Sequence, residues 1–541
     1  MVNSTKERTL SENTVIDAEL MRTSEIRNGE FVRYYGKKSE LVIPDTVTTI
    51  SAGAFRDNSK LTHLVLGKNV SVIQPNAFRG CKNLRTITLP SGLRIIGDEA
   101  FRECISLTSV ILPRTVISVG NGAFRACTAL KRAVLSTSLS NLGSYAFCDC
   151  IGLEEVILPE NLSIIHRGTF FNCSALHSIE IPDSVHTVGR YAFGHCAALK
   201  SLKLSEELAY LGSGAFADCR TLSAFCIPPK VRFVGDYTFS RCESLKEISL
   251  PEGLTHIGVN AFCACRGLCK VVFSSTLTNV GASAFLGCDA LEEIVIPSKV
   301  RSLGRSAFAY CTNLRKVEIH AMPESIEDET FLCCFSLAEI KIPDSVTRIG
   351  EKAFAKCLSL SSIRLSQALE LIETHAFAEC ESLTAISLPT TLKRAEARVF
   401  ADCTSLTTAI LPDRRTVIEH SIFSGCDALK ILVVPSQLRL LRYRLDRWSV
   451  STDAKVLSHA DLQVARLLKE RSDEETTEER RFEIDNEIKK IKGLHALQKY
   501  RKRKQKQASP SSKATEEAEA NKAPASKGIS ESNKTSAEKG S

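Results

Sequence analysis

The chain has 541 residues, 43% of them hydrophobic, and a formal net charge of +8. This composition can bury a large core, which excludes a fully disordered chain, and no apolar run reaches the ~20 residues of a membrane-spanning helix. The first residues, MVNSTKERTLSENT, lack the apolar stretch of a signal peptide, so we expect an intracellular protein, cytoplasmic or nuclear.

Residues 1–28 carry no repeat and are predicted to form an N-terminal extension. The sequence then has a period of 23 residues, which phenylalanine marks most clearly. Seventeen phenylalanines follow this period without an insertion or deletion: Phe55, Phe78, Phe101, Phe124, Phe147, Phe170, Phe193, Phe216, Phe239, Phe262, Phe285, Phe308, Phe331, Phe354, Phe377, Phe400 and Phe423. Leucine follows each of them by six residues, and cysteine follows sixteen of them by three. Such a period is typical of a solenoid, in which one unit cannot bury its apolar face alone.

One unit, LTSVILPRTVISVGNGAFRACTA, shows what each position contributes. Leu107–Leu112 is short and rich in β-branched residues, which predicts a strand that Pro113 ends. Val116–Val119 is a second extended piece, and Gly120 suits a tight bend because glycine has no Cβ atom. The spacing of the apolar residues in Ala123–Cys127 predicts a single helical or 3₁₀ turn.

The order Leu, Pro, Gly, Ala-Phe and Cys within this unit resembles the BspA-like class of leucine-rich repeats, which is found in many large cell-surface and microbial proteins. The resemblance covers roughly residues 31 to 442. It implies a repeat solenoid that is mainly β, with a curved parallel sheet along one face and short helical or 3₁₀ turns. It does not imply an enzymatic activity.

Both ends of such a stack need a cover for the exposed core. Residues 29–50 keep the register of a half-unit, and Phe31, Tyr34 and Tyr35 are predicted to cover the first rung. At the other end the repeat decays, because glutamate replaces the bend glycine in late units. We therefore expect the solenoid, with seventeen units and two end caps, to occupy residues 29–444.

Sixteen of the 21 cysteines belong to the repeat, in phase with phenylalanine and leucine, which predicts buried, reduced thiols that act as small hydrophobic groups. Disulfides between rungs stay open on distance alone, since equivalent atoms lie about 4.8 Å apart, but equivalent side chains point in parallel. Cys263, Cys265 and Cys269 are a weak metal signal, because Cys265 is a core position. No catalytic or nucleotide-binding motif occurs, so we expect a non-enzymatic protein with no cofactor and no metal.

Strand residues that face solvent are free to differ between units. Ile111, Val134 and Ile157 fall at one such position in three successive units. Two interpretations stay open: strand propensity alone explains these residues, or they form a strip that binds a protein partner. Charges of alternating sign, as at Glu293 and Lys316, are expected to pair across strands.

Residues 445–506 are predicted to form a charged helical segment. Asp453–Lys469 has the spacing of an amphipathic helix, and Trp448 just before it is a candidate for packing against the last rung. Phe482–Leu497 resumes helical spacing, either as a short two-stranded coiled coil or as a lone charged helix. Residues 507–541 hold no aromatic residue and are rich in Ser, Lys, Ala and Glu, which predicts a disordered tail.

A basic cluster ends the helical segment. Its members are Lys499, Arg501, Lys502, Arg503, Lys504 and Lys506. Three interpretations stay open. The cluster is a solvated helix end, where cations interact favourably with the helix dipole, a nuclear localisation signal, or a site that binds nucleic acid or anionic lipid.

The sequence therefore predicts a protein–protein interaction scaffold that uses the exposed face of the solenoid, with a protein partner that the sequence does not name. One alternative is a cell-surface adhesin, the role that the resemblance implies for secreted members. The other is a nucleic-acid-associated protein that acts through the basic cluster.

Overall fold

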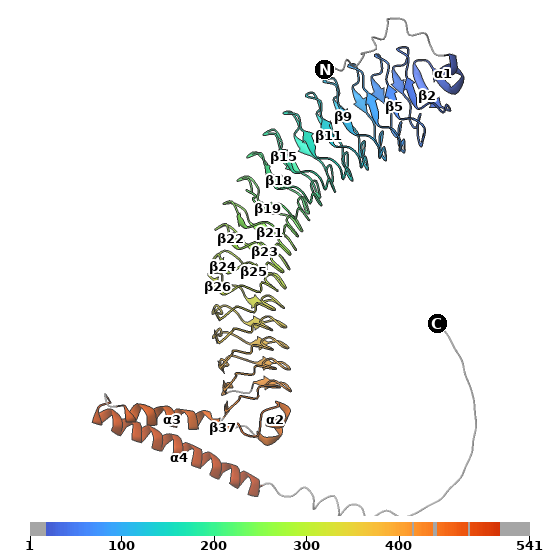
Figure 1. Cartoon of the computed structure of the whole chain (residues 1–541). Coiled ribbons are helices and arrows are strands. Elements are labelled where there is room, and N and C mark those ends of the chain that lie inside the picture. Colours follow the sequence, from blue (N-terminus) through green and yellow to red (C-terminus); the bar gives the residue numbers. More distant parts are fainter. Residues whose placement is uncertain (1–17, 414–415, 436–440, 474–475, 509–541) are drawn as a thin grey trace, which may run out of the picture. The chain divides into compact units, whose positions relative to one another are not determined.

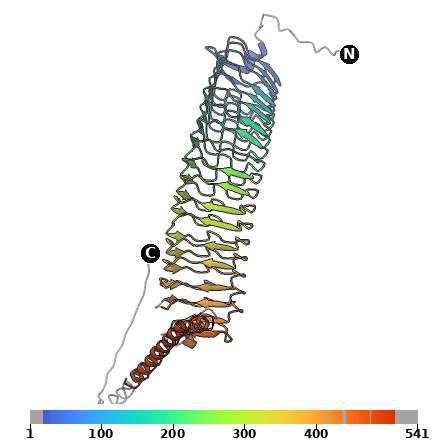
Figure 2. The ribbon, with the colours of Figure 1, turned by 90° about the vertical axis from the view of Figure 1, so that its left-hand side faces the viewer.

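The computed structural model describes residues 18–413, 416–435, 441–473 and 476–508. The chain forms two compact units, divided between Leu457 and Ser458. The first unit is a curved solenoid of stacked rungs, which Figures 1 and 2 show from two directions. The second unit contains two long helices.

All but one of the described rungs contribute a strand of three or four residues to one side of the solenoid, the long-strand face. Neighbouring strands pair in parallel with an offset of 23 residues, so that Val134 lies opposite Ile111 and Ile157. The predicted repeat solenoid with a parallel sheet is thereby confirmed. The strands are β3 (Glu40–Val42), β5 (His63–Val65), β7 (Thr86–Thr88), β9 (Ser109–Ile111), β11 (Arg132–Val134), β13 (Glu155–Ile157), β15 (Ser178–Glu180), β17 (Ser201–Lys203), β20 (Glu247–Ser249), β22 (Lys270–Val272), β24 (Glu293–Ile296), β26 (Lys316–Ile319), β28 (Glu339–Lys341), β30 (Ser362–Arg364), β32 (Ala385–Ser387), β34 (Thr408–Ile410) and β36 (Ile431–Val434).

Each rung then turns and contributes a two-residue strand to a second side, the short-strand face. Val119 in one of these strands pairs with Ile96 and Leu142 and is fully buried, so the core lies between the two faces. The strands are β4 (Thr49–Ile50), β6 (Val72–Ile73), β8 (Ile95–Ile96), β10 (Ser118–Val119), β12 (Asn141–Leu142), β14 (Ile164–Ile165), β16 (Thr187–Val188), β18 (Tyr210–Leu211), β19 (Phe233–Val234), β21 (His256–Ile257), β23 (Asn279–Val280), β25 (Ser302–Leu303), β27 (Ser325–Ile326), β29 (Arg348–Ile349), β31 (Leu371–Ile372), β33 (Arg394–Ala395) and β35 (Val417–Ile418).

The corner around each repeat phenylalanine forms linked turns, not the predicted helical or 3₁₀ turn. Cys127 N–H donates to Phe124 O at 3.2 Å, but Phe124 N–H donates to Ala146 O of the next rung at 2.8 Å. Gly122 and Ala126 have left-handed φ values of 58° and 59°. Successive N–H groups therefore alternate between a bond within the rung and a bond to the next rung, so the corner adds a third column of hydrogen bonds between rungs.

One rung among those that the structure describes forms no strand on the long-strand face, at residues 224–226. Phe225 stands there at the inward position that Ile248 occupies in the next rung. Its ring lies 4.9 Å from that of Phe216 and 4.6 Å from that of Phe239, both edge to face. The larger side chain overfills the position, which explains why the main chain leaves the ladder at this rung.

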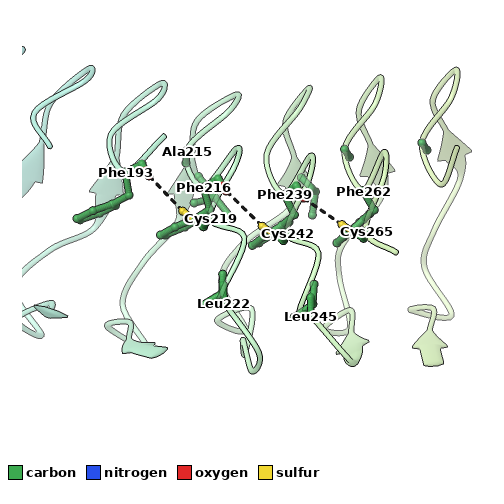
Figure 3. Packing of buried hydrophobic residues seen from close by; sticks show 14 of the residues in the cluster. Phe193, Ala215, Phe216, Cys219, Leu222, Phe239, Cys242, Leu245, Phe262 and Cys265 are labelled. Carbon is green, nitrogen blue, oxygen red and sulfur yellow. Dashed lines mark hydrogen bonds between the residues drawn. The ribbon is translucent and has the colours of Figure 1, made fainter. Parts of the chain in front are cut away.

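The repeat phenylalanines form one stack through the core, part of which is shown in Figure 3. From Phe55 to Phe423, neighbouring ring centroids lie 5.0–5.9 Å apart, and the ring planes are within 17° of parallel. None of these rings is more than 1% exposed. Each ring packs between the rings of the two neighbouring rungs, so an insertion would take a ring out of the stack, which explains why the register has none.

Each repeat cysteine has a hydrogen-bond partner that the sequence did not reveal. Its thiol donates to the carbonyl oxygen of the phenylalanine 26 residues earlier, with Sγ to O distances of 3.0–3.3 Å. Figure 3 shows this bond from Cys242 to Phe216. All sixteen thiols are free and buried, as predicted. The cysteine both fills volume and satisfies a buried carbonyl group.

The solenoid starts with a cap that begins before the predicted residue 29. α1 (Ala18–Thr23) leads into β1 (Ser24–Arg27), which pairs antiparallel with β2 (Glu30–Tyr34). β2 in turn pairs in parallel with β4 of the first rung. The described part of the predicted extension 1–28 therefore belongs to the cap, because its backbone groups pair with the edge of the short-strand face.

Two of the three aromatic residues predicted to cover the first rung do so. Phe31 is fully buried, and its ring centroid lies 4.9 Å from that of Phe55. Tyr34 is 7% exposed and contacts the same ring. Tyr35 is 65% exposed, so its predicted covering role is wrong. Adjacent residues of an extended chain point to opposite sides, which allows only one of the two tyrosines to face the core.

The other end of the solenoid is closed by residues beyond the predicted limit at 444. α2 (Leu441–Arg447) is followed by Trp448 and then by β37 (Lys455–Ser458), which lies beside β36 in the sheet. Trp448 is 1% exposed, and its Nε1 donates to Ile418 O at 3.3 Å. Its carbonyl oxygen accepts from Phe423 N–H at 3.1 Å. The prediction that Trp448 packs against the last rung is confirmed.

Trp448→Ala is expected to lower the local free energy of unfolding of the last rungs by about 3–5 kcal/mol, because it removes a fully buried ring. Hydrogen exchange followed by mass spectrometry should become faster around Phe423 and stay unchanged around Phe124. Trp448→Phe, which keeps most of the ring volume, should have a smaller effect. Unchanged exchange in the last rungs would show that Trp448 does not close the stack.

The second unit begins with α3 (His459–Ser472), followed by α4 (Glu478–Ala508). The helix predicted over Asp453–Lys469 thus starts later than expected, because residues 455–458 form β37. Ser458 caps α3, and its Oγ accepts from Asp461 N–H at 3.2 Å. The helical spacing of the apolar residues in the sequence also included residues of this strand, so it did not show where the strand ends and the helix begins.

α3 and α4 pack on each other within the chain. Leu467, Ile484 and Ile488 are buried between them. Arg471 Nε lies 2.9 Å from Asp485 Oδ1 across the pair. The interpretation of residues 482–497 as a lone helix is therefore wrong, and the short two-stranded coiled coil stays a prediction. Residues 507 and 508 are the end of α4, and the rest of the predicted tail lies outside the described residues.

Tyrosine and glycine alternate at one corner position of five successive rungs: Tyr145, Gly168, Tyr191, Gly214 and Tyr237. A Cβ atom at Gly168 would lie 2.4 Å from Tyr145 Cε1, and one at Gly214 would lie 2.2 Å from Tyr191 Cε1. Each of these two tyrosine rings therefore lies over the glycine of the next rung.

Candidate functional site

Ile111, Val134 and Ile157 lie side by side on β9, β11 and β13 of the long-strand face, and they are named here the apolar strip. Ile111 is 65% exposed, Ile157 is 44% exposed and Val134 is half-buried. Their inward neighbour Val110 is 3% exposed. The core of these rungs is thus filled without the apolar strip, as the sequence predicted.

Charged side chains border the apolar strip. Arg132 Nε lies 3.0 Å from Glu155 Oε2 across neighbouring strands, and Lys131 Nζ lies 3.6 Å from Glu154 Oε1. All four side chains are more than half exposed, and exposed pairs of this kind contribute only about 0–1 kcal/mol to stability. These charges are therefore available to a partner without a large loss of stability.

The rest of the long-strand face carries a second apolar pair and an ion pair within one strand. Val272 and Val295 form a second exposed apolar pair, 46% and 47% exposed, at the same repeat position as the strip. Lys316 Nζ lies 2.6 Å from Glu318 Oε1 on its own strand, while Glu293, which lies opposite Lys316 on the neighbouring strand as predicted, interacts with it at longer range. Residues two apart in a strand point to the same side, which brings Lys316 and Glu318 together.

The three cysteines of the weak metal signal lie in different surroundings. Cys265 is buried and bonded to Phe239 O, whereas Cys269 is exposed and donates to Lys246 O at 3.3 Å. No group of three or more His, Cys, Asp and Glu side chains in the described ranges is placed to hold a metal ion. Burial raises the pKa of the repeat thiols, to about 12 for Cys196, which opposes formation of the reactive thiolate.

The basic cluster lies in the C-terminal part of α4, where the main chain stays helical to Ala508. Its three interpretations stay predictions. Within the ranges given above, none of the helices combines the length and the apolar composition that crossing a membrane requires.

A groove of about 470 Å³ lies on the short-strand face of the first rungs. Gly97, Gly120 and Gly143 occupy one position along it. The sequence indicated only that these glycines allow a tight bend. A groove appears only when equivalent glycines of successive rungs are stacked, so a single unit gives no signal for it.

The repeat region matches a known protein family. The family model for the BspA type leucine rich repeat region (6 copies) matches residues 24–153, 118–246, 232–358 and 324–445. The chain belongs to the BspA-type leucine-rich repeat family. The resemblance drawn from the phased Phe, Leu and Cys residues is confirmed, and the matches include the N-terminal hairpin that the sequence alone did not place in the solenoid.

Solved structures of bacterial leucine-rich repeat proteins are similar to this chain. A leucine-rich repeat protein from Bacteroides ovatus is 25% identical, with 81% of this chain and 97% of that chain covered and a TM-score of 0.42. The leucine-rich repeat protein of T. pallidum is 31% identical over 36% of this chain and 82% of its own, with a TM-score of 0.30. A leucine-rich cell surface protein from Faecalibacterium prausnitzii is 24% identical over 63% and 94%, with a TM-score of 0.41. No curated protein matches the chain.

Leucine-rich-repeat solenoids are in general protein-interaction scaffolds or surface proteins, and the BspA-type family is typically non-catalytic. The exposed faces of the solenoid are therefore the surfaces on which a function has to be sought.

Proposed function

We propose that this protein is a non-enzymatic interaction scaffold that binds a protein partner through the apolar strip. The exposure of Ile111 carries the proposal. An isoleucine that is 65% exposed within a sheet loses unfavourable contact with water when a partner covers it. Ile157 extends this surface by two rungs, so the exposed apolar area is continuous.

The apolar strip is suited to the centre of an interface. Protein interfaces place apolar residues at the centre and charged residues at the rim, which is the order of Ile111 and the neighbouring Arg132–Glu155 pair. A stable interface buries about 1,200–2,000 Å² in total. The partner must therefore also cover neighbouring rungs, where the side chains differ from unit to unit and can supply specificity.

Replacing Ile111, Val134 and Ile157 together by threonine is expected to keep the fold and to weaken binding. Threonine is β-branched and preserves strand propensity, while the interface loses the apolar contacts that carry much of the affinity. In quantitative pull-downs, the recovery of specific partners should fall at least tenfold. Circular dichroism and the melting temperature should stay close to those of the parent protein.

A matched control is the double replacement of Val272 and Val295 by threonine, at the same repeat position on other rungs. It makes the same chemical change on the same face and should leave recovery unchanged. If the triple variant returns the same partners in the same amounts, the apolar strip is not the binding site.

The alternatives drawn from the sequence stay predictions. An adhesin would act outside the cell, whereas the scaffold proposed here would act inside it. Localisation of a fluorescent fusion distinguishes these two locations. A nuclear signal that disappears on removal of Lys499–Lys506 would assign the basic cluster to targeting.

A further inference from the structure

The groove on the short-strand face has the dimensions of a ligand site. Its floor holds Gly97, Gly120 and Gly143, and Gln74 and His166 stand at the same position in the rungs on either side and line its ends. The floor therefore spans three rungs, which repeat about 4.8 Å apart. Its volume of about 470 Å³ is in the range of small-molecule sites.

Stacking of the rungs creates this floor. A Cβ atom at Gly120 would lie 2.5 Å from the main-chain nitrogen of Asp98, and one at Gly143 would lie 2.6 Å from that of Asn121. Neither position accommodates a side chain without movement of the main chain. A trough therefore remains between the short strands and the corner that follows them.

Polar side chains line both walls of the groove. On one wall, Asn141 Nδ2 donates to Ser118 Oγ at 3.0 Å. On the other, Asn121 Oδ1 accepts from Ser144 N–H at 2.9 Å, and Asp98 Oδ1 accepts from Asn121 N–H at 2.7 Å. In the described part of the chain, no hydrogen bond uses the side-chain Nδ2 group of Asn121 or the hydroxyl group of Ser144. These groups are therefore available to a ligand.

The geometry points to a neutral linear oligosaccharide of about three sugar units as the ligand of this groove. Sugar hydroxyls both donate and accept hydrogen bonds, which matches amide, hydroxyl and carboxylate groups. Asp98 opposes an anionic ligand, and the described lining residues include no lysine or arginine to bind a phosphate or a carboxylate. Ile95, which is 40% exposed at the edge, offers an apolar contact to the face of a sugar ring. This site is separate from the apolar strip and does not rest on the proposed protein partner.

The spacing of the polar groups favours a glycan over a peptide. Equivalent side chains such as Ser118 and Asn141 recur about 4.7–4.9 Å apart. A hexose unit within a chain has about this length, so successive sugars meet side chains at equivalent positions on successive rungs. An extended peptide advances about 3.3–3.6 Å per residue and loses register with the rungs within two residues.

Isothermal titration calorimetry of the full chain with linear trisaccharides of glucose, mannose, galactose and N-acetylglucosamine tests this inference. At least one trisaccharide should bind, and its monosaccharide should bind at least tenfold more weakly because it reaches one rung instead of three. Asn121→Asp should weaken binding about tenfold. Aspartate keeps the acceptor for the next rung, as Asp236 does for Val259 N–H at 2.8 Å, but lacks the amide donors.

Ser118→Phe should abolish binding by filling the groove, and Phe233 shows that a rung accepts phenylalanine at this position. Ser325→Phe is the matched control, because Ser325 stands at the same position in a rung where Glu327 replaces the glycine of the floor. It should bind like the parent protein. The inference is overturned if none of the trisaccharides binds, if Ser118→Phe binds as the parent does, or if both serine variants lose binding equally.

Discussion

Phe239→Ala is expected to lower the free energy of unfolding by about 3–5 kcal/mol, the usual cost of truncating a buried phenylalanine. Phe239 is fully buried between the rings of Phe216 and Phe262, with centroids at 5.8 and 5.3 Å. It also contacts Phe225 edge to face at 4.6 Å. Each rung of a solenoid is stabilised mainly by its two neighbours, so the loss should be concentrated in the rungs around this cavity.

Urea unfolding gives the total loss, and hydrogen exchange followed by mass spectrometry locates it. Exchange should become faster in the rungs around Phe239 and stay unchanged near Phe78. Phe233→Ala is the matched control, because Phe233 is 57% exposed on the short-strand face, and its cost should stay within about 0.5 kcal/mol. Equal effects of the two replacements would contradict the claim that the buried ring stack stabilises the solenoid.

The solenoid is expected to unfold steeply above about pH 9 because of its sixteen buried thiols. The pKa of all sixteen lies above the ordinary value of 9.0, mainly because of burial and, for Cys403 and Cys426, mainly because of a hydrogen bond with the preceding thiol of the column; it rises to about 12 for Cys81, Cys196 and Cys311. Above pH 9 the folded chain keeps these protons while the unfolded chain loses them. Stability is therefore fully present below that pH and falls as the pH rises.

The size of this effect follows from the number of thiols. Each thiol that ionises only on unfolding removes about 1.4 kcal/mol of stability per pH unit, so sixteen of them remove roughly 20 kcal/mol per unit. The stability of a typical domain is about 5–15 kcal/mol. An increase of about one pH unit above the ordinary thiol pKa of 9.0 should therefore be sufficient to unfold the solenoid.

Circular dichroism and the ultraviolet absorbance of thiolates, followed through an alkaline titration, should change together with one midpoint. A variant with alanine at Cys196, Cys219, Cys242 and Cys265 should show a shallower dependence of stability on pH. Thiolate absorbance that rises while the circular dichroism signal persists would show that the thiols ionise in the folded chain, contrary to the expectation.

The register of the fold could be read from the sequence because the core admits so little variation. Phe124, Cys127 and Leu130 are all fully buried, and each repeats every 23 residues. The position of Ile111 on the solvent side followed from the period of two in a strand. These predictions rest on burial alone, and burial directly restricts which residue types can occupy a position.

Features that depend on contacts between rungs could not be predicted as well from the sequence. The corner around Phe124 has apolar spacings that suit both a 3₁₀ turn and linked turns, and only its hydrogen bond to Ala146 separates them. The cap strands β1 and β37 lie outside the repeat and share none of its marker residues. The groove depends on three stacked glycines, and each of them alone indicates nothing more than a bend.

The alternation of tyrosine and glycine from Tyr145 to Tyr237 restricts how this chain can lengthen. The core would allow duplication of any single unit, because the phenylalanine and cysteine columns repeat every 23 residues. At this corner, however, a copied unit would place two tyrosines or two glycines in succession. A tyrosine following Tyr145 would have its Cβ atom 2.4 Å from that ring, the clash that Gly168 avoids. A copied single unit therefore requires this ring to move, whereas a copied pair of rungs keeps the alternation.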